Sequence, residues 1–132
     1  MGSLKQVILI RRDLNMRRGK EIAQGSHASM DFIVERVRNR LPGSRTSEVS
    51  IHFSEVEKNW ISGGMAKICL QVGSEEELMM IYKKAVDAGL EARIIRDSGK
   101  TEFGGKPTVT SLAIGPADSE SIDAITGHLT LY

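Results

Sequence analysis

Two segments of the chain carry residues whose types and spacing look at first like those of a phosphate-binding loop. They contain the pairs Gly19-Lys20 and Gly99-Lys100, and Thr101 follows the second pair, as in the closing triplet of a nucleotide-binding loop. Such a loop also needs an earlier glycine at a fixed spacing, and those positions hold Leu14 and Ile94. Neither pair therefore belongs to a nucleotide-binding loop, and the two lysines need another explanation.

Lys20 is expected at or near the start of a helix, where it can bind an anion. Unpaired backbone N–H groups and the positive end of the helix dipole lie there, and an ammonium adds to both. Gln24 and His27 follow at helical spacing and form one polar stripe with Lys20, while Arg17 and Arg18 come just before it. The same residues also fit the solvated edge of a helix, so the pattern leaves both interpretations open.

Asp97 and Thr101 bring a carboxylate and a hydroxyl onto one tight loop. Such a pair can orient a water molecule or accept its proton, which is the chemistry of hydrolysis. The alternative is structural, because an aspartate in this setting often bonds to the backbone of its own turn. Together with Lys20 and the neighbouring His27, these two residues form a candidate site for such chemistry.

Other kinds of chemistry have less support in the sequence. His27, His52 and His128 are far apart and show no paired-ligand spacing, so no metal site is predicted. Cys69 lies in the middle of an apolar run, which favours a core position over a nucleophile. No cofactor is expected.

The periodicity of apolar residues predicts strands and helices that alternate along the chain. Strands are expected over residues 6–10, 66–72, 91–95 and 108–114, and helices over residues 18–41, 48–60, 74–89 and 118–126. In the first helix, the apolar stripe is expected to include Ile22, Met30 and Leu41. This order of elements predicts an α/β sandwich.

The predicted sheet brings the two lysine-bearing segments together. Ligands of α/β sheets bind beyond the carboxyl ends of the strands. Residues 11–20 follow the first strand and residues 97–107 follow the third. Both segments are therefore expected to belong to one site.

Length, charge and composition point to a small intracellular protein with an anionic partner. The 132 residues are 40% hydrophobic, and no apolar run approaches the ~18 residues of a membrane span. Residues 1–45 carry ten Lys/Arg and four Asp/Glu, a net charge of +6, which favours a nucleic acid as partner. A single cysteine suits a reducing compartment, so a cytoplasmic protein without a signal peptide is expected, and residues 1–3 are interpreted as a remnant of cloning.

Four segments resemble the type II peptidyl-tRNA hydrolases, the archaeal and eukaryotic type. They are RRDLNMRRGKEIAQGSHAS (11–29), IIRDSGKTEF (94–103), LAIGPAD (112–118) and IDAITGHLTLY (122–132). The resemblance implies a three-layer α/β/α sandwich around a four-stranded mixed sheet whose last strand is antiparallel. It also implies hydrolysis of the ester between a peptide and tRNA, without a metal, in an enzyme that is often a homodimer.

The resemblance assigns roles to the residues that the loops indicate. The family's catalytic residues fall on Lys20, Asp97 and Thr101. Residues expected to bind the peptidyl-tRNA substrate are Gln24, His27, Arg17, Arg18 and Lys100, with Arg11 and Arg12 adding contacts to the tRNA backbone. The whole chain, 1–132, is expected to form one domain, with a variable insertion at 42–62.

The chain departs from the family pattern inside the second loop, and two alternative functions stay open. Ser98, Lys100 and Glu102 stand where the family usually has alanine, arginine and glutamine. One alternative is a module of the same fold that binds tRNA or another RNA without cleaving it. The other is a hydrolase of a different peptide-like ester or amide, which free tRNA would not inhibit.

Overall fold

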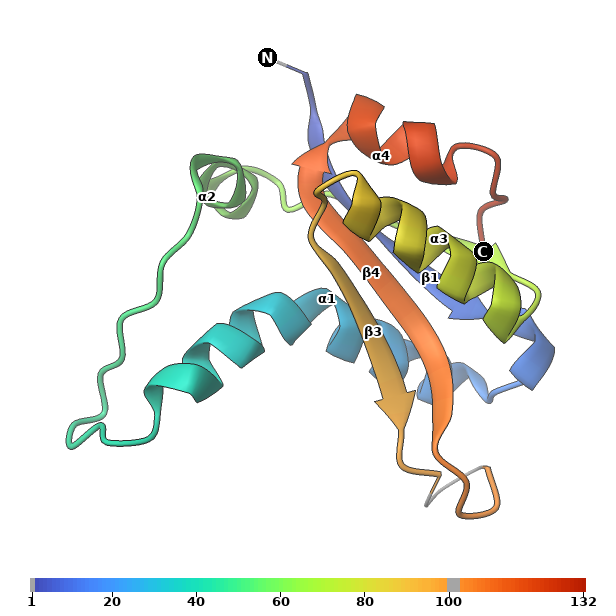
Figure 1. Cartoon of the computed structure of the whole chain (residues 1–132), viewed down its shortest axis with the longest axis horizontal. Helices are drawn as coiled ribbons and strands as arrows, with labels where there is room; N and C mark the ends of the chain where they lie inside the picture. Colours follow the sequence, from blue (N-terminus) through green and yellow to red (C-terminus); the bar gives the residue numbers. More distant parts are fainter. Residues whose placement is uncertain (1, 100–102) are drawn as a thin grey trace.

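The computed structural model of the chain describes residues 2–99 and 103–132. In this part of the chain, four strands form one mixed sheet in the order β2-β1-β4-β3 (Figure 1). The strands are β1 (Leu4–Arg11), β2 (Lys67–Val72), β3 (Ala92–Asp97) and β4 (Thr108–Asp118). Strand β1 is parallel to β2, and β4 is antiparallel to both of its neighbours, β1 and β3. The prediction of an antiparallel last strand is confirmed.

Helices cover both faces of the sheet and complete three layers. The helices are α1 (Arg18–Arg40), α2 (Glu55–Ser62), α3 (Glu75–Asp87) and α4 (Ser119–Thr126), with a short 3-10 turn, η1 (Arg12–Leu14), after β1. Helix α1 crosses one face, while α3 and α4 pack on the other (Figure 1). The three-layer α/β/α sandwich predicted from the sequence is confirmed.

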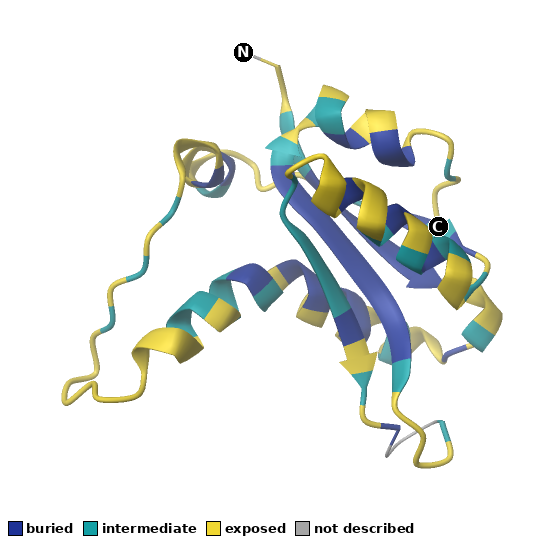
Figure 2. Ribbon diagram, viewed as in Figure 1, coloured by how far each residue is buried: buried dark blue, intermediate teal, exposed yellow. Residues whose placement is uncertain are grey.

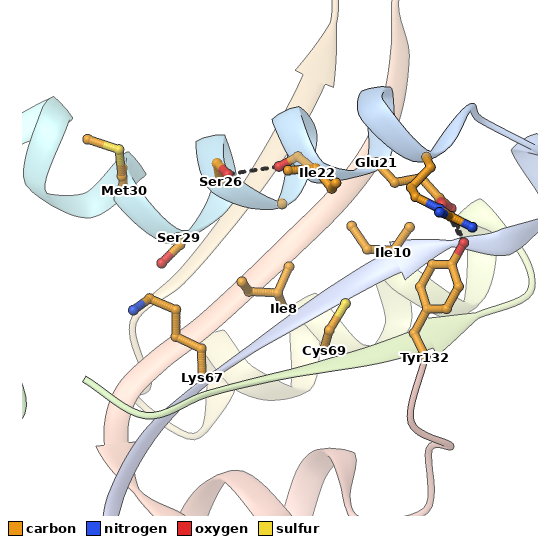
Figure 3. A pocket seen from close by; sticks show the side chains of 12 residues that line it. Ile8, Ile10, Glu21, Ile22, Ser26, Ser29, Met30, Lys67, Cys69 and Tyr132 are labelled. Atoms are coloured by element: carbon orange, nitrogen blue, oxygen red, sulfur yellow. Dashed lines mark hydrogen bonds between the residues drawn. The ribbon is translucent and has the colours of Figure 1, made fainter. Parts of the chain in front are cut away.

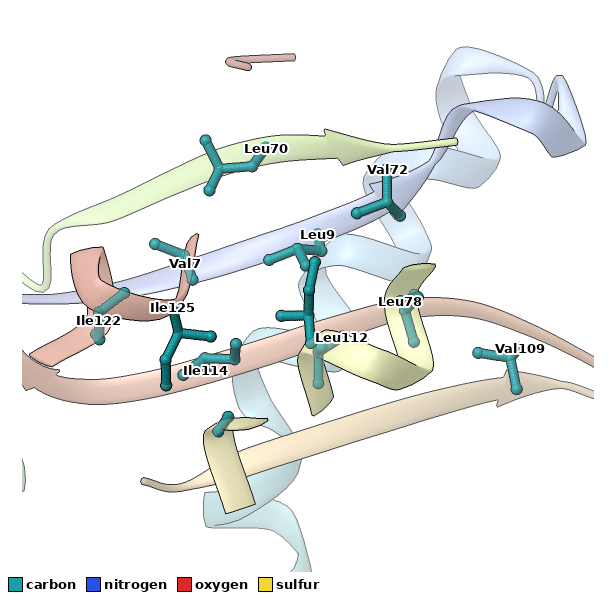
Figure 4. Packing of buried hydrophobic residues seen from close by; sticks show 12 residues of the cluster. Val7, Leu9, Leu70, Val72, Leu78, Val109, Leu112, Ile114, Ile122 and Ile125 are labelled. Carbon is teal, nitrogen blue, oxygen red and sulfur yellow. The ribbon is translucent and has the colours of Figure 1, made fainter. Parts of the chain in front are cut away.

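Strand β1 is buried on both faces because its side chains alternate between two cores. Val7 and Leu9 point toward α3 and α4 and join the larger core, which is shown in Figure 4. Ile8 and Ile10 point the other way and pack toward α1 with Ala28. An apolar run without polar alternation is therefore what this central position requires.

Helix α1 turns a different face to the sheet than the apolar stripe predicts. Ile22 is 63% exposed and Met30 is 56% exposed. The buried face instead consists of Gln24, Gly25, Ala28, Ser29 and Phe32. Small side chains let the helix approach the sheet closely, and the buried polar groups have partners. The predicted stripe was therefore wrong as a core face, although the helix itself was predicted correctly.

Helix α2 is shorter than the predicted helix over residues 48–60. It begins at Glu55, because Ser54 and Glu57 form a reciprocal capping box in which each side chain accepts from the other's backbone N–H, at 3.1 and 2.8 Å. Residues 41–54 contain neither helix nor strand, and most of them are exposed (Figure 2). The predicted start at residue 48 was wrong.

Strand β4 continues past the predicted end at residue 114 and reaches Asp118. Gly115 makes this extension sterically feasible, because a Cβ at this position would lie 2.7 Å from the carbonyl oxygen of Lys5 and φ is +100°. A register shift between Lys5 and Val7 accommodates the irregular stretch. Gly115 and Pro116 therefore lie within an irregular part of β4 and do not end the strand.

In the described part of the chain, none of the helices combines the length and the apolar character that a membrane span requires.

Candidate active site

The site forms where the first turn of α1 meets the end of β3. Lys20 lies in the first turn of α1, and Asp97 is the last residue of β3. The Lys20 Nζ donates to Asp97 Oδ1 at 2.6 Å, across 77 residues of sequence. The two side chains are only 14% and 10% exposed. The structure thus brings together two of the three predicted catalytic residues.

The carboxylate of Asp97 is held at both oxygens. Its Oδ2 accepts the backbone N–H of Gly99 at 2.8 Å, so the turn expected as a structural alternative is present as well. The pKa of Asp97 is lowered, chiefly by the hydrogen bond from Lys20; burial opposes this effect, and the Gly99 N–H adds to it. Asp97 is therefore a stable anion at neutral pH.

Gly99 is required by the path of the loop that follows β3. Its φ is +84°, and a Cβ would lie 2.3 Å from the carbonyl oxygen of Lys106. The chain therefore folds back on itself directly after Asp97. Gly99, the glycine of the apparent nucleotide-binding triplet, is therefore explained by the backbone conformation of this loop.

Gln24 is tied to strand β4 and lies on the buried face of α1. Its Oε1 accepts the hydroxyl of Thr110 at 2.6 Å, and its backbone carbonyl accepts the hydroxyl of Ser111 at 3.3 Å. Because Thr110 occupies the oxygen of the amide, the Nε2 group is left to donate elsewhere. Sequence reasoning missed Thr110; its only signal is that two adjacent hydroxyl residues, Thr110 and Ser111, lie in a buried strand.

Comparison with known proteins places the chain in a family. The family model described as "Peptidyl-tRNA hydrolase PTH2" matches residues 4–132. This chain belongs to that family. It is 42% identical over 129 residues to the peptidyl-tRNA hydrolase of Aeropyrum pernix, covering 97% of this chain and 95% of that protein. It is also 40% identical over 129 residues to that of Methanocaldococcus jannaschii, covering 97% and 99%. The probable peptidyl-tRNA hydrolase 2 of Dictyostelium discoideum is 40% identical over 133 residues, covering 100% of this chain and 56% of that protein.

The other residues predicted for this PTH2 family member lie on the surface or outside the described part. Arg17 and Arg18 are exposed at the start of α1, and His27 is exposed two turns further along the helix. Thr101 and Lys100 lie outside the described residues. The predicted roles of these five residues therefore stay predictions.

Arg11 does not fit its predicted contact with a tRNA backbone. Its side chain is 10% exposed; the guanidinium donates to both carboxylate oxygens of Asp13 at 3.1 and 2.6 Å and to the carbonyl of Val109 at 3.0 Å. It therefore fastens the turn after β1 to β4, and the prediction for this residue was wrong. Arg12 is exposed, and its guanidinium carbon lies 4.3 Å from the ring centre of Tyr132.

Phe103 adds an apolar wall that the sequence reasoning did not anticipate in this family's site. The Lys20 Nζ lies 6.0 Å from the centre of the Phe103 ring, and the ring packs against the smaller core beneath α1. An aromatic face attracts an ammonium at this distance through the quadrupole of the ring. The signal in the sequence was a single aromatic residue next to two glycines.

The arrangement suits hydrolysis by a positioned water molecule. An anionic carboxylate can orient a water, and an ammonium at a helix N-terminus can stabilise a developing oxyanion. Among residues 2–99 and 103–132, no group of three or more His, Cys, Asp or Glu side chains could hold a metal ion. The described residues therefore supply a carboxylate, an ammonium and amide donors.

Proposed function

We propose that this chain hydrolyses the ester that joins a peptide to the terminal ribose of tRNA. The observation that carries the proposal is the contact between Lys20 and Asp97. Residues from two distant segments, both among those that resemble the family, meet at one point where both side chains are largely buried. The names of the related proteins support the same substrate.

In the proposed mechanism, Asp97 and Thr101 orient a water molecule toward the ester carbonyl carbon. The lowered pKa of Asp97 makes it a weak base, so its main role is to hold the water and to balance the positive charge that develops on it. Lys20 and the N-terminus of α1 stabilise the oxyanion. The water oxygen bonds to the carbonyl carbon, and the bond from that carbon to the ribose oxygen breaks. The ribose oxygen takes one proton of the water, the second proton passes to solvent, and the peptide leaves as a carboxylate.

The proposed substrate contacts come from α1 and from the segment of the sequence that follows β3. Arg17, Arg18 and Lys100 contact phosphates of the tRNA, and His27 lies further along the same helix. The amide of Gln24, oriented by Thr110, donates its Nε2–H to the substrate. These contacts read charge and shape, not base sequence, which suits an enzyme that acts on many tRNAs.

We further propose that the whole chain, 1–132, acts as one domain in the cytoplasm and assembles as a homodimer. These parts of the proposal rest on the resemblance to the family and on the composition. Light scattering coupled to size exclusion at micromolar protein tests the homodimer, and a mass of one chain, 14.5 kDa, would contradict it.

The test of the proposed reaction is release of diacetyl-lysine from diacetyl-lysyl-tRNA. We expect turnover by the wild type that free tRNA inhibits, and a loss of about 100-fold or more in Asp97→Asn. Asp87→Asn is the matched control, because Asp87 lies on α3 and pairs at the surface with Lys83. Binding of tRNA without turnover would show a binding module instead. Turnover that free tRNA does not inhibit would show a different substrate.

A further inference from the structure

A groove of about 790 Å³ runs between α1 and strands β1 and β2 (Figure 3). Lys20 and Asp97 do not line it. Asp97 lies on β3, at one edge of the sheet, whereas the groove opens toward β2, at the other edge. The groove and the proposed catalytic pair are therefore on opposite flanks of the same helix.

The groove exists because α1 covers only part of its face of the sheet. The helix packs on β3, β4 and β1, and leaves the adjoining face of β2 open. Ile8 and Ile10 form the floor with Cys69, and Ile22 and Met30 project along the helix wall (Figure 3). A hollow of a few hundred to about 1,000 Å³ with an apolar lining is typical of small-molecule sites.

The length of the groove suits a single extended chain. Its helical wall extends from Arg18 to Met30, and twelve residues of α-helix rise about 18 Å. Ile22 and Met30 are more than half exposed, so two large apolar side chains of this wall, about 12 Å apart along the helix axis, are left in water. An apolar chain laid along this wall would remove both from water.

Cations lie at the two ends of the groove. Arg18 is at one end, where the carboxylate of Glu21 accepts the hydroxyl of Tyr132. Lys67 is at the other end; its Nζ donates to the carbonyl of Met65 at 3.1 Å. An ammonium has three donors, so Lys67 can keep this bond and also donate to an anion. The charges therefore favour an apolar ligand with an anionic head.

We propose that this groove binds a single-chain carboxylate, with the chain along Ile10, Ile8 and Met30 and the head at Lys67. The site is separate from the proposed hydrolytic site and does not depend on it. The chemistry is that of a free fatty acid. Each methylene that becomes buried should tighten binding, by about two- to fourfold.

The chain carries two natural reporters for this test. Trp60 is its single tryptophan, and the Lys67 Nζ lies 5.1 Å from the centre of the indole ring. Cys69 is its single cysteine and lines the groove. Titration with octanoate, decanoate and dodecanoate below their micelle concentrations should change the Trp60 emission saturably, with affinity rising along the series. Bound decanoate should slow alkylation of Cys69 by about fivefold or more.

Variants separate the groove from unspecific binding. Ser26→Phe fills the groove and should abolish the response, whereas Ala23→Phe, an exposed position on the same helix outside the lining, should not. Lys67→Gln should lower the affinity for decanoate by about fivefold, whereas Lys58→Gln, at the surface of α2, should leave it unchanged. Decyltrimethylammonium, with the same chain and a cationic head, should bind more weakly than decanoate.

Three results would overturn the proposal. The first is the absence of a saturable response to any carboxylate of the series. The second is binding that survives Ser26→Phe or that does not depend on the charge of the head. The third is a dimer that Ser26→Phe dissociates, because a second copy of the chain would then occupy the groove.

Discussion

Asp97 keeps its negative charge because donors occupy both of its oxygens. The ammonium of Lys20 and the N–H of Gly99 stabilise the anion more than burial destabilises it. A carboxylate of this kind can orient water but is poor at removing a proton. The ion pair therefore favours a mechanism in which position and electrostatics contribute more than base strength.

The pKa of Asp97 gives a direct prediction at the scale of a residue. It should lie below the ordinary value of 3.8 in the wild type, and should rise in Lys20→Gln, where the chief cause of the shift is gone. Because the folded-state pKa is depressed, the ion pair adds stability above pH 3.8, and this stability is lost as pH falls through the folded pKa. NMR titration of the Asp97 carboxyl carbon measures both values. Equal values in the two proteins would contradict the assigned cause.

The elements that position the site are joined by ion pairs as well as by apolar packing. Arg36 on α1 donates to both carboxylate oxygens of Glu57 on α2, each at 2.8 Å, and to Glu91, just before β3, at 3.0 Å. The pKa of Glu57 is lowered, chiefly by the hydrogen bonds from Arg36. One guanidinium thus links α1, α2 and the start of the strand that carries Asp97.

Glu57→Ala should destabilise the fold by about 2–3 kcal/mol, because it removes the capping-box partner of Ser54 and leaves Arg36 with one carboxylate fewer. Glu55→Ala is the control on the same helix; its partner is Lys58, both side chains are more than half exposed, and the change should stay within about 0.5 kcal/mol. Urea denaturation measures the free energy of unfolding of both variants. Equal losses in the two variants would show that the Arg36 network does not hold α2.

At the scale of the whole molecule, basic residues gather at the start of α1, near the proposed site. Binding of tRNA there should release counterions and weaken as salt rises. The double variant with Arg17→Gln and Arg18→Gln should bind more weakly and reduce the slope of log affinity against log salt by about two.

The matched control is the double variant with Lys83→Gln and Lys84→Gln on α3, which packs on the opposite face of the sheet. It should leave both the affinity and the slope unchanged. Filter binding of tRNA across a salt series provides the values. If the control variant lost as much affinity for tRNA as the α1 variant, the tRNA would bind elsewhere on the molecule.

Much of this molecule could be predicted from its sequence where one local cause dominates. The apolar run over residues 6–10 predicted the strand β1. The helix predicted over residues 74–89 corresponds to α3, at whose start the Ser74 hydroxyl accepts the Glu77 N–H at 3.0 Å. The meeting of Lys20 and Asp97 also followed, because parallel strands bring their carboxyl ends to one edge of the sheet.

Other features depend on contacts that local patterns do not record. The buried face of α1 contains Gln24 because Thr110, far away in sequence, satisfies its amide. In the sequence, Arg11 looks like a surface charge. In the folded chain, its guanidinium donates hydrogen bonds to Asp13 and to the carbonyl of Val109. In both cases, a polar residue has a structural role through a partner on β4, Thr110 or Val109, that is far away in sequence.

The central claim is that Lys20 and Asp97 act as one catalytic unit, and a double-mutant cycle on hydrolysis of diacetyl-lysyl-tRNA tests it most directly. Lys20→Ala and Asp97→Asn should each lower kcat/KM by about 100-fold or more, and the double variant should be hardly slower than either. Losses that multiply in the double variant, or a Lys20→Ala enzyme with the wild-type rate, would contradict it.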